Sequence, residues 1–271
     1  MARFLQHKEE AYWFYRFLSI GYDHYINPWF YTPAMRDEGL TLAELNRQDM
    51  EVVDVGAGTG FATEGIVRFV KASHVHALDQ SDHQQAKAKK KPLLKGVHFY
   101  LGDAERLPWE TDRFDRYVSS GSIEYWPEPQ RAIAEAYRIL KPGGLATILG
   151  PLQPENRIGR FLAETFMLFP TLEEYLLWYK TAGFVDVTYR FIRPEWVTRE
   201  AYALSIVGRK PAAGASPWKP PTATPAESLA EKTSSRRSRL LFLTRFALGS
   251  IAGGLFIPIA IAKTLLRKST R

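Results

Sequence analysis

Short apolar runs, separated by stretches with helical spacing, fill the middle of the chain. The apolar runs, which have the length of buried strands, cover residues 51–55, 75–79, 97–101, 114–119 and 145–150. Helical spacing is found over residues 61–70, 129–140 and 171–182. Strands that alternate with helices favour a parallel sheet with helices on both faces. The runs 185–192 and 201–209 are expected to complete a seven-stranded, Rossmann-like α/β domain over residues 49–210.

An N-terminal helical cap is expected over residues 1–48. Its first helix, Arg3–Ile20, is rich in aromatic residues and ends before Pro28. Its second helix runs from Pro33 to about Asn46, with proline in the first turn, where a missing N–H costs nothing. The cap either packs on the domain as a cover or closes over a ligand as a lid. The chain opens on neither a signal-peptide nor a transit-peptide pattern, so an imported protein would be in its mature form.

The composition changes beyond residue 210. Residues 211–239 are rich in Pro, Ala, Ser and Thr, which predicts a flexible linker. Residues 240–263 are apolar apart from Arg245 and Lys263 and predict a transmembrane helix. As a helix, residues 240–262 would be about 35 Å long, enough for a ~30 Å hydrocarbon core if Arg245 snorkels to the interface. An interfacial helix is the alternative. A basic tail, residues 264–271, follows.

The positive charge lies in the C-terminal region. The chain has 36 Lys or Arg and 29 Asp or Glu side chains, a net charge of +7. Residues 231–271 hold nine of the basic side chains and one acid, Glu231, which leaves 27 basic and 28 acidic side chains in residues 1–230. A neutral body with a basic tail indicates membrane contact rather than nucleic-acid binding. Gly249 and Gly253, spaced as GxxxG, indicate a weak site for helix pairing and hence a homodimer.

Cysteine is absent from the chain, which excludes disulfides, thiolate metal sites and a cysteine nucleophile. No group of His and acidic residues has metal-ligand spacing in the sequence, so we expect a reaction without a metal.

The first strand runs directly into Gly56, Gly58 and Gly60. Glycines at alternate positions let the backbone turn tightly and let a ligand approach it closely. The helix that follows turns its free N–H groups to the same place, the carboxyl edge of the strand. A dinucleotide fingerprint would need its third glycine at position 61, which is Phe61. The motif predicts a nucleotide-type site, with an ordinary strand-to-helix turn as the alternative.

Acidic residues follow the next two strands at the same edge. Asp79 ends the second strand 25 residues after Asp54 and can accept hydrogen bonds from both hydroxyls of a ribose. Asp103 follows the third strand. These spacings, together with the Leu-Lys-Pro-Gly-Gly run at 140–144, resemble the class I S-adenosylmethionine (SAM) methyltransferases. In that class the acid after the third strand reaches the adenine amino group, and Asp103 matches it. The resulting SAM-binding set is Asp54, Gly56, Gly58, Gly60, Asp79, Gln80, Asp103, Ala104 and Ser120.

Residues 120–127 follow the fourth strand and combine small residues with Glu124, Tyr125 and Trp126. They form either a wall between the methyl donor and an aromatic acceptor, or turn and packing residues. From the cap, Tyr22, His24 and Tyr25 are expected to face the substrate if the cap is a lid, and with Trp126 the two tyrosines make up the expected substrate-binding set.

Several runs resemble the plastid methyltransferases that act on 2-methyl-6-phytyl-1,4-hydroquinol and its solanesyl analogue, and the resemblance covers nearly the whole chain. The runs are Phe4–Lys8, Trp13–Ile20, Tyr22–His24, Gly58–Phe61, Gly121–Pro127 and Met167–Pro170. The resemblance implies C-methylation of prenylated hydroquinols in tocopherol and plastoquinone biosynthesis. It also implies a lipid substrate and a place in the chloroplast inner envelope membrane.

A general base would help such a reaction, because removing a phenol proton pushes charge onto the ring carbons. The candidates are His24, which titrates near neutrality, and Glu124. Tyr125 and Asp23 are weaker candidates, and His7 is a further one.

Other function classes stay open. A methyltransferase for ubiquinone- or menaquinone-type quinols, or for a sterol, would share everything except the acceptor site. A non-catalytic SAM-binding membrane protein would bind SAM and transfer nothing. A nicotinamide-dependent oxidoreductase is disfavoured by Phe61.

Overall fold

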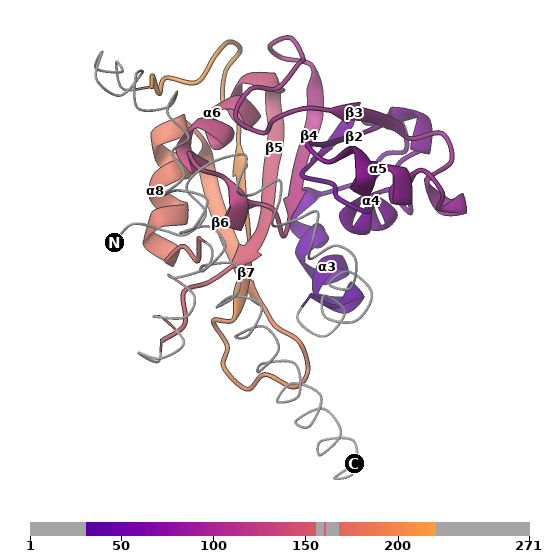
Figure 1. Cartoon of the computed structure of the whole chain (residues 1–271). Coiled ribbons are helices and arrows are strands. Elements are labelled where there is room, and N and C mark those ends of the chain that lie inside the picture. Colours follow the sequence, from indigo (N-terminus) through magenta and orange to yellow (C-terminus); the bar gives the residue numbers. More distant parts are fainter. Residues whose placement is uncertain (1–30, 156–159, 161–167, 221–271) are drawn as a thin grey trace, which may run out of the picture.

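The computed structural model describes residues 31–155, 160 and 168–220. In this part of the chain seven strands form one mixed sheet in the order β3-β2-β1-β4-β5-β7-β6 (Figure 1). The strands are β1 Val52–Val55, β2 Val75–Asp79, β3 His98–Leu101, β4 Phe114–Ser120, β5 Leu140–Pro151, β6 Val185–Ile192 and β7 Ala203–Arg209. Neighbours from β3 to β5 pair in parallel, and β7 pairs antiparallel with both β5 and β6. The predicted α/β class with a seven-stranded sheet is confirmed.

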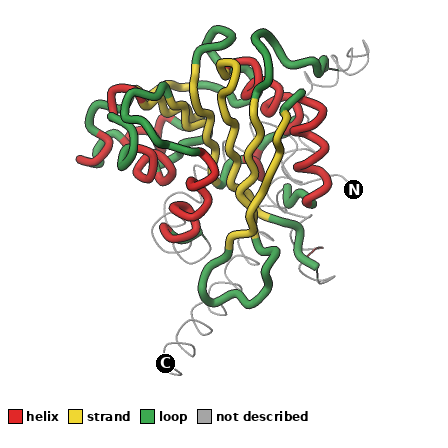
Figure 2. Tube along the Cα trace, turned by 180° about the vertical axis from the view of Figure 1, so that it is seen from behind, coloured by secondary structure: helices red, strands yellow, loops and turns green. Residues whose placement is uncertain are grey.

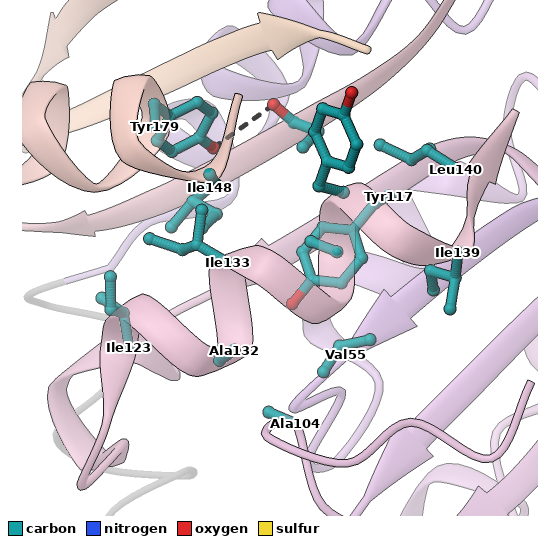
Figure 3. Close-up of a cluster of buried hydrophobic side chains, with 14 of the residues drawn as sticks. Val55, Ala104, Tyr117, Ile123, Ala132, Ile133, Ile139, Leu140, Ile148 and Tyr179 are labelled. Carbon is teal, nitrogen blue, oxygen red and sulfur yellow. Dashed lines mark hydrogen bonds between the residues drawn. The ribbon is translucent and has the colours of Figure 1, made fainter. Parts of the chain in front are cut away.

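Helices cover both faces of the sheet. They are α3 Pro33–Leu40, α4 Phe61–Ile66, α5 Asp82–Ala88, α6 Pro129–Ile139 and α8 Leu172–Ala182. Figure 1 shows α6 and α8 beside β5 and β6, and α4 and α5 beside β2 and β3. Since successive side chains of a strand point to opposite faces, β1 contributes to two cores. Val53 packs in the core with α6 and α8, as does Val55 (Figure 3). Val52 packs in the core with α4 and α5.

Two predicted helices are shorter than expected. The second cap helix ends at Leu40 and continues as a 3₁₀ turn, Thr41–Ala43, because Glu44 takes a left-handed conformation with φ 47°. The helix after the glycine motif ends at Ile66 rather than Val70. The helices that precede and follow β1, α3 and α4, are therefore both short.

The strand predicted over residues 145–150 begins earlier, at Leu140, directly after the helix predicted over residues 129–140. Helix α6 ends at Ile139, and Leu140 is already extended and paired with Phe114 of β4. Regular pairing resumes only at Leu145, so residues 141–144 form an irregularity inside β5. Gly143, with φ 79°, serves this irregular segment and not the helix end.

The predicted linker starts with a segment that is fixed to the domain. Lys210 has no exposed surface, and its Nζ donates hydrogen bonds to the carbonyls of Gly214 (2.7 Å) and Arg138 (3.2 Å). The same ammonium pairs with Asp112 at 2.5 Å, as a buried charge requires. Ser216 Oγ donates to the carbonyl of Ala182 at 2.8 Å. The domain therefore extends past the predicted boundary at residue 210.

Several predictions lie outside the described residues. These are the first cap helix, the transmembrane helix at 240–263, the Gly249 and Gly253 pairing site and the basic tail. In the part of the chain that is described, no helix combines the length and apolar character needed to cross a bilayer.

Figure 2, seen from behind, shows the loop between β6 and β7 projecting beyond the end of the sheet.

Candidate active site

The three glycines of the motif have different structural functions. All have positive φ, at 73° for Gly56, 53° for Gly58 and 85° for Gly60. A Cβ on Gly56 would lie 1.9 Å from Ser122 Oγ, and one on Gly60 would lie 2.5 Å from a methyl carbon of Leu94. A Cβ on Gly58 would have no described atom within 4 Å. Gly56 and Gly60 are therefore required by packing, whereas Gly58 presents its backbone to open space.

The end of β2 holds the glycine loop in place. The N–H groups of Gly56 and Ala57 both donate to the carbonyl of Leu78, at 2.8 and 3.0 Å. Gly58 N–H donates to Asp79 Oδ2 at 2.7 Å, and Ser81 N–H donates to Oδ1 at 2.8 Å. Asp79 therefore lies directly against the open glycine.

Asp54 lies beneath the loop, with no exposed surface. Thr63 Oγ1 donates to its Oδ2 at 2.6 Å, which joins α4 to β1. Its Oδ1 has no hydrogen-bond partner among the described residues. Burial, and secondarily the charge of Asp79, raises the pKa of Asp54 to about 7. The Asp54 carboxyl, which the sequence predicts to bind SAM, is thus a buried group beneath the loop, and one of its oxygens has no hydrogen-bond partner among the described residues.

The residues after β2 and β3 lie at the same edge. Gln80 is exposed in the turn after Asp79. Asp103 is half-buried, and its Oδ1 accepts a hydrogen bond from Glu105 N–H at 3.0 Å, which fixes a tight turn. The Ala104 side chain packs in the core with Val55 (Figure 3), so only its backbone remains for a ligand.

The segment after β4 packs directly against the glycine loop. It turns at Gly121, with φ 61°, and continues as a 3₁₀ helix, Ile123–Tyr125. Ser122 lies under Gly56 and accepts a hydrogen bond from Trp126 Nε1 at 2.9 Å. Trp126 is buried in the core, as the packing alternative predicts, while Tyr125 is partly exposed. Ser120 Oγ is buried and has no partner within the described part of the chain.

Glu124 is the buried titratable group of this segment. Its Oε2 is buried and has no hydrogen-bond partner among the described residues, although the side chain as a whole is partly exposed. Burial raises the pKa of its carboxyl to about 7. This carboxyl therefore exchanges a proton near neutral pH, the range in which a general base is most effective.

Two tyrosines near Glu124, Tyr31 and Tyr175, were not among the site residues predicted from the sequence. Burial raises the pKa of both Tyr31 and Tyr175, and the charge of Glu124 raises each pKa further. Tyr175 OH donates to the carbonyl of Pro151 at 3.1 Å and fits against Gly150, which has no side chain there. The helical spacing that predicts α8 does not reveal that Tyr175 points to the site. Tyr31 lies between two predicted helices, where periodicity carries no signal.

Phe61 stands where a dinucleotide-binding motif would have its third glycine, and it contacts helix α3 of the cap. It is the first residue of α4, and its carbonyl accepts a hydrogen bond from Arg36 Nη1 of α3 at 3.1 Å. The Arg36 guanidinium also lies over the Phe61 ring, 5.0 Å from its centre. Helix α3 is thereby tied to the start of the helix that follows the three glycines.

The other predicted site residues, Tyr22, Asp23, His24, Tyr25 and His7, lie outside the described residues. The structure brings Asp54, Asp79, the glycines and Ser122 together, with Glu124 on the adjoining segment. Within residues 31–155 and 168–220, no three His or acidic side chains are arranged to hold a metal ion.

Comparisons with known proteins first define the class. A family model described as a methyltransferase domain matches residues 53–148. The solved structure of a putative methyltransferase from Haloferax volcanii, in complex with its Trm112 activator, has a TM-score of 0.61 and 21% identity; the match covers 77% of this chain and 98% of that one. With the glycine loop and Asp79 in place, the chain is a SAM-dependent methyltransferase with the class I fold.

The curated relatives narrow the assignment to one family. The chloroplastic 2-methyl-6-phytyl-1,4-hydroquinone methyltransferase of Arabidopsis thaliana is 53% identical over 264 residues, which cover 96% of this chain and 77% of the relative. The Spinacia oleracea protein of the same name is 49% identical, with 96% and 75% covered. The chain belongs to the 2-methyl-6-phytyl-1,4-hydroquinone methyltransferases.

Proposed function

We propose that this protein transfers a methyl group from SAM to a ring carbon of 2-methyl-6-phytyl-1,4-hydroquinol and of its solanesyl analogue, in tocopherol and plastoquinone biosynthesis. The observation that carries the proposal is the position of Glu124. A carboxyl that ionises near neutrality lies two residues from Ser122, which packs under the glycine loop. The names of the relatives support the acceptor, since they specify this hydroquinone.

The donor half of the site, made of the ends of β1 and β2 with the glycine loop, would hold SAM. The Gly58 backbone offers the close approach that a nucleoside needs, and Asp79 adjoins it. We assign the ribose hydroxyls to Asp79, with Gln80 beside it, and the adenine to Asp103 and the backbone of Ala104. Asp54 supports the loop from below and keeps Oδ1 for the donor.

SAM would supply an already activated methyl group, whose carbon–sulfur bond breaks as the ring carbon of the deprotonated phenol bonds to it. The methylated carbon then loses its ring hydrogen as a proton and the phenol oxygen regains one, which restores the aromatic hydroquinol. The protein must therefore align the acceptor and exclude water. Glu124 takes the phenol proton, because its carboxylate and carboxylic acid are both populated near pH 7. The hydroxyl that reacts is ortho or para to the methylated carbon, where its negative charge is delocalised.

The acceptor-side predictions that lie outside the described residues stay proposals. His24 is the second candidate base, and Tyr22 and Tyr25 are candidate substrate contacts. A His24→Ala enzyme with unchanged turnover from pH 6 to 9 would remove His24 as a base. Tyr125, which adjoins Glu124 and is partly exposed, is a weaker candidate.

We further propose that residues 240–263 anchor the protein in the chloroplast inner envelope membrane. The apolar run flanked by basic residues supports this, and a prenylated acceptor dissolved in a bilayer gives an anchor its purpose. The relatives are named as chloroplastic proteins. Pairing through Gly249 and Gly253 would make the anchored form a homodimer. Extraction of membranes at alkaline pH would release the protein if the anchor were wrong.

The test of the function is methyl transfer to a panel of acceptors. Detergent-solubilised protein is given SAM with a radiolabelled methyl group and, separately, 2-methyl-6-phytyl-1,4-hydroquinol, its solanesyl analogue, a demethylmenaquinol and a sterol. Label in a dimethyl phytyl or solanesyl product is the expected result. Label only in the menaquinol or the sterol would select the alternative methyltransferases. SAM binding without transfer to any acceptor would indicate a non-catalytic protein.

A further inference from the structure

Besides Asp54 Oδ1 and Ser120 Oγ, which belong to the predicted SAM-binding set, two buried oxygen atoms at the carboxyl edge of the sheet lack a hydrogen-bond partner among the described residues. They are Oε2 of Glu124 and the hydroxyl oxygen of Tyr31. Buried polar groups are paired in the great majority of cases, and an exception calls for an explanation. The two atoms belong to separate parts of the chain, since Tyr31 precedes α3 and Glu124 follows β4.

Packing places Tyr31 beside the end of β5. Its ring packs on a small cluster that includes Leu149 of β5, Ile192 of β6 and Ala203 of β7. Leu149 immediately precedes Gly150, and a Cβ on Gly150 would lie 2.8 Å from Ile123 and 2.1 Å from Tyr175 OH. Ile123 adjoins Glu124 in the chain. Tyr31 and Glu124 therefore lie on two sides of the same strand end.

Electrostatics supports this proximity. The charge of Glu124 raises the pKa of both Tyr31 and Tyr175, and Tyr31 raises the pKa of Tyr175 as well. Tyr175 already donates its hydroxyl hydrogen to Pro151. Of the three, Tyr31 and Glu124 thus keep unused hydrogen-bonding capacity within the described structure.

The two unused groups are complementary. Burial and the nearby carboxylate raise the pKa of Tyr31, so its hydroxyl stays protonated and is a donor at neutral pH. Glu124 is a proton acceptor once it is ionised. A phenol that loses its proton to one of them leaves an oxygen with negative charge that needs a donor, and the other supplies it. A hydrogen bond to developing charge in a buried site contributes more than the same bond in water.

We propose that Tyr31 and Glu124 together bind one hydroxyl group of the hydroquinol acceptor, with Glu124 taking the proton and Tyr31 donating a hydrogen bond to the same oxygen. This inference rests on the proposed function, because it requires a phenolic acceptor. It makes Tyr31 a catalytic residue, and it gives both of the buried oxygens a hydrogen-bond partner.

The test compares Tyr31→Phe with Tyr179→Phe. Tyr179 is a matched control because its hydroxyl is also buried but hydrogen bonds to the carbonyls of Ala146 and Ile206, both at 3.3 Å, deep in the core (Figure 3). Three quantities are measured for each protein: methyl transfer to 2-methyl-6-phytyl-1,4-hydroquinol, SAM affinity by calorimetry, and unfolding by urea.

Tyr31→Phe should lower kcat at least ten-fold and leave SAM affinity within two-fold of wild type. Its unfolding free energy should equal or exceed that of wild type, since the removed hydroxyl has no described partner. Tyr179→Phe should be less stable than wild type and keep its kcat. A Tyr31→Phe enzyme with wild-type kcat, or one whose stability falls as much as that of Tyr179→Phe, would overturn the inference and leave the proposed function standing. Absence of methyl transfer by the wild-type protein would overturn both.

Discussion

The two halves of the site are built in different ways. In the donor half, defined above, backbone hydrogen bonds hold the residues in position. Asp79 accepts hydrogen bonds from two backbone N–H groups, and the glycine loop donates two to the carbonyl of Leu78. The acceptor half, made of Tyr31 and Glu124, contains two buried oxygens, the Tyr31 hydroxyl and Glu124 Oε2, without partners among the described residues. In the donor half, Asp54 Oδ1 and the Ser120 hydroxyl are in that state, but the other Asp54 oxygen accepts a hydrogen bond from Thr63.

The difference indicates what each half must recognise. A donor site that is fixed by backbone hydrogen bonds is formed before any ligand arrives and suits a molecule used by many methyltransferases. On the proposed assignment, we expect the acceptor half, with its unpaired donor and acceptor, to be completed by its substrate. The following variants test whether the two halves act separately.

The largest expected effect is that of Glu124→Gln in the acceptor half. The amide keeps the shape but cannot take a proton, so kcat should fall about 100-fold, the lower end of the usual range for a lost general base. SAM affinity should stay within two-fold. Glu128→Gln is the matched control, since Glu128 is exposed and pairs with Arg131. A parallel loss of SAM affinity in Glu124→Gln would show that the halves are not separate.

Alanine at the glycines comes next. Gly56→Ala should lower the free energy of unfolding by about 2–4 kcal/mol, because positive φ and overlap with Ser122 both oppose a Cβ. Gly58→Ala introduces only backbone strain, so its free energy of unfolding should fall by about 1 kcal/mol. SAM affinity should nonetheless fall in Gly58→Ala. Denaturant titration and calorimetry measure the two effects, and equal stability losses would contradict the assignment of Gly58 to ligand approach.

Asp79→Ala should weaken SAM binding ten-fold or more, a change of about 1.4 kcal/mol, because hydrogen bonds to a charged group are lost. At saturating SAM the kcat should remain within a few-fold of wild type. Asp82→Ala, three residues further on and exposed, should leave SAM affinity unchanged. If Asp79→Ala lowered kcat and left SAM affinity intact, Asp79 would belong to the acceptor half.

The smallest effect concerns His76, far from both halves near the start of β2. Burial lowers the pKa of His76, despite its contact with Glu51 at 3.0 Å. The folded protein therefore binds this proton less readily than the unfolded chain does. The contribution of neutral His76 to the free energy of unfolding should therefore be fully present above pH ~6.5, the ordinary pKa of histidine. It should decline as the pH falls below that value. Urea unfolding between pH 5 and 8 measures this decline, and His76→Gln should reduce it.

The donor half could be predicted from the sequence because its signal is local. Gly56, Gly58 and Gly60 adopt conformations that other residues avoid, and Asp79 ends β2, paired with Leu101 at the end of β3. The end of helix α6 was predicted to within one residue, but the early start of β5 was not. Leu140 pairs with Phe114 of β4, a contact between distant segments that the sequence around it does not reveal.

The acceptor half depends on contacts between distant segments. Tyr31 meets the end of β5 through tertiary packing alone, and nothing in the spacing around it marks it out. Glu124 was predicted as a candidate from its place after the fourth strand, but its burial follows from the packing of the folded chain. Trp126 has the character of a substrate contact in the sequence and lies in the core.

The most direct test of the account is the pH dependence of kcat for methyl transfer to 2-methyl-6-phytyl-1,4-hydroquinol, with both substrates saturating. If Glu124 is the base, the wild-type rate should rise with pH through about 7, as its carboxyl ionises, and then level off. The remaining rate of Glu124→Gln should lack this rise. The same inflection near pH 7 in both proteins, or a wild-type rate that is flat from pH 6 to 9, would contradict the account.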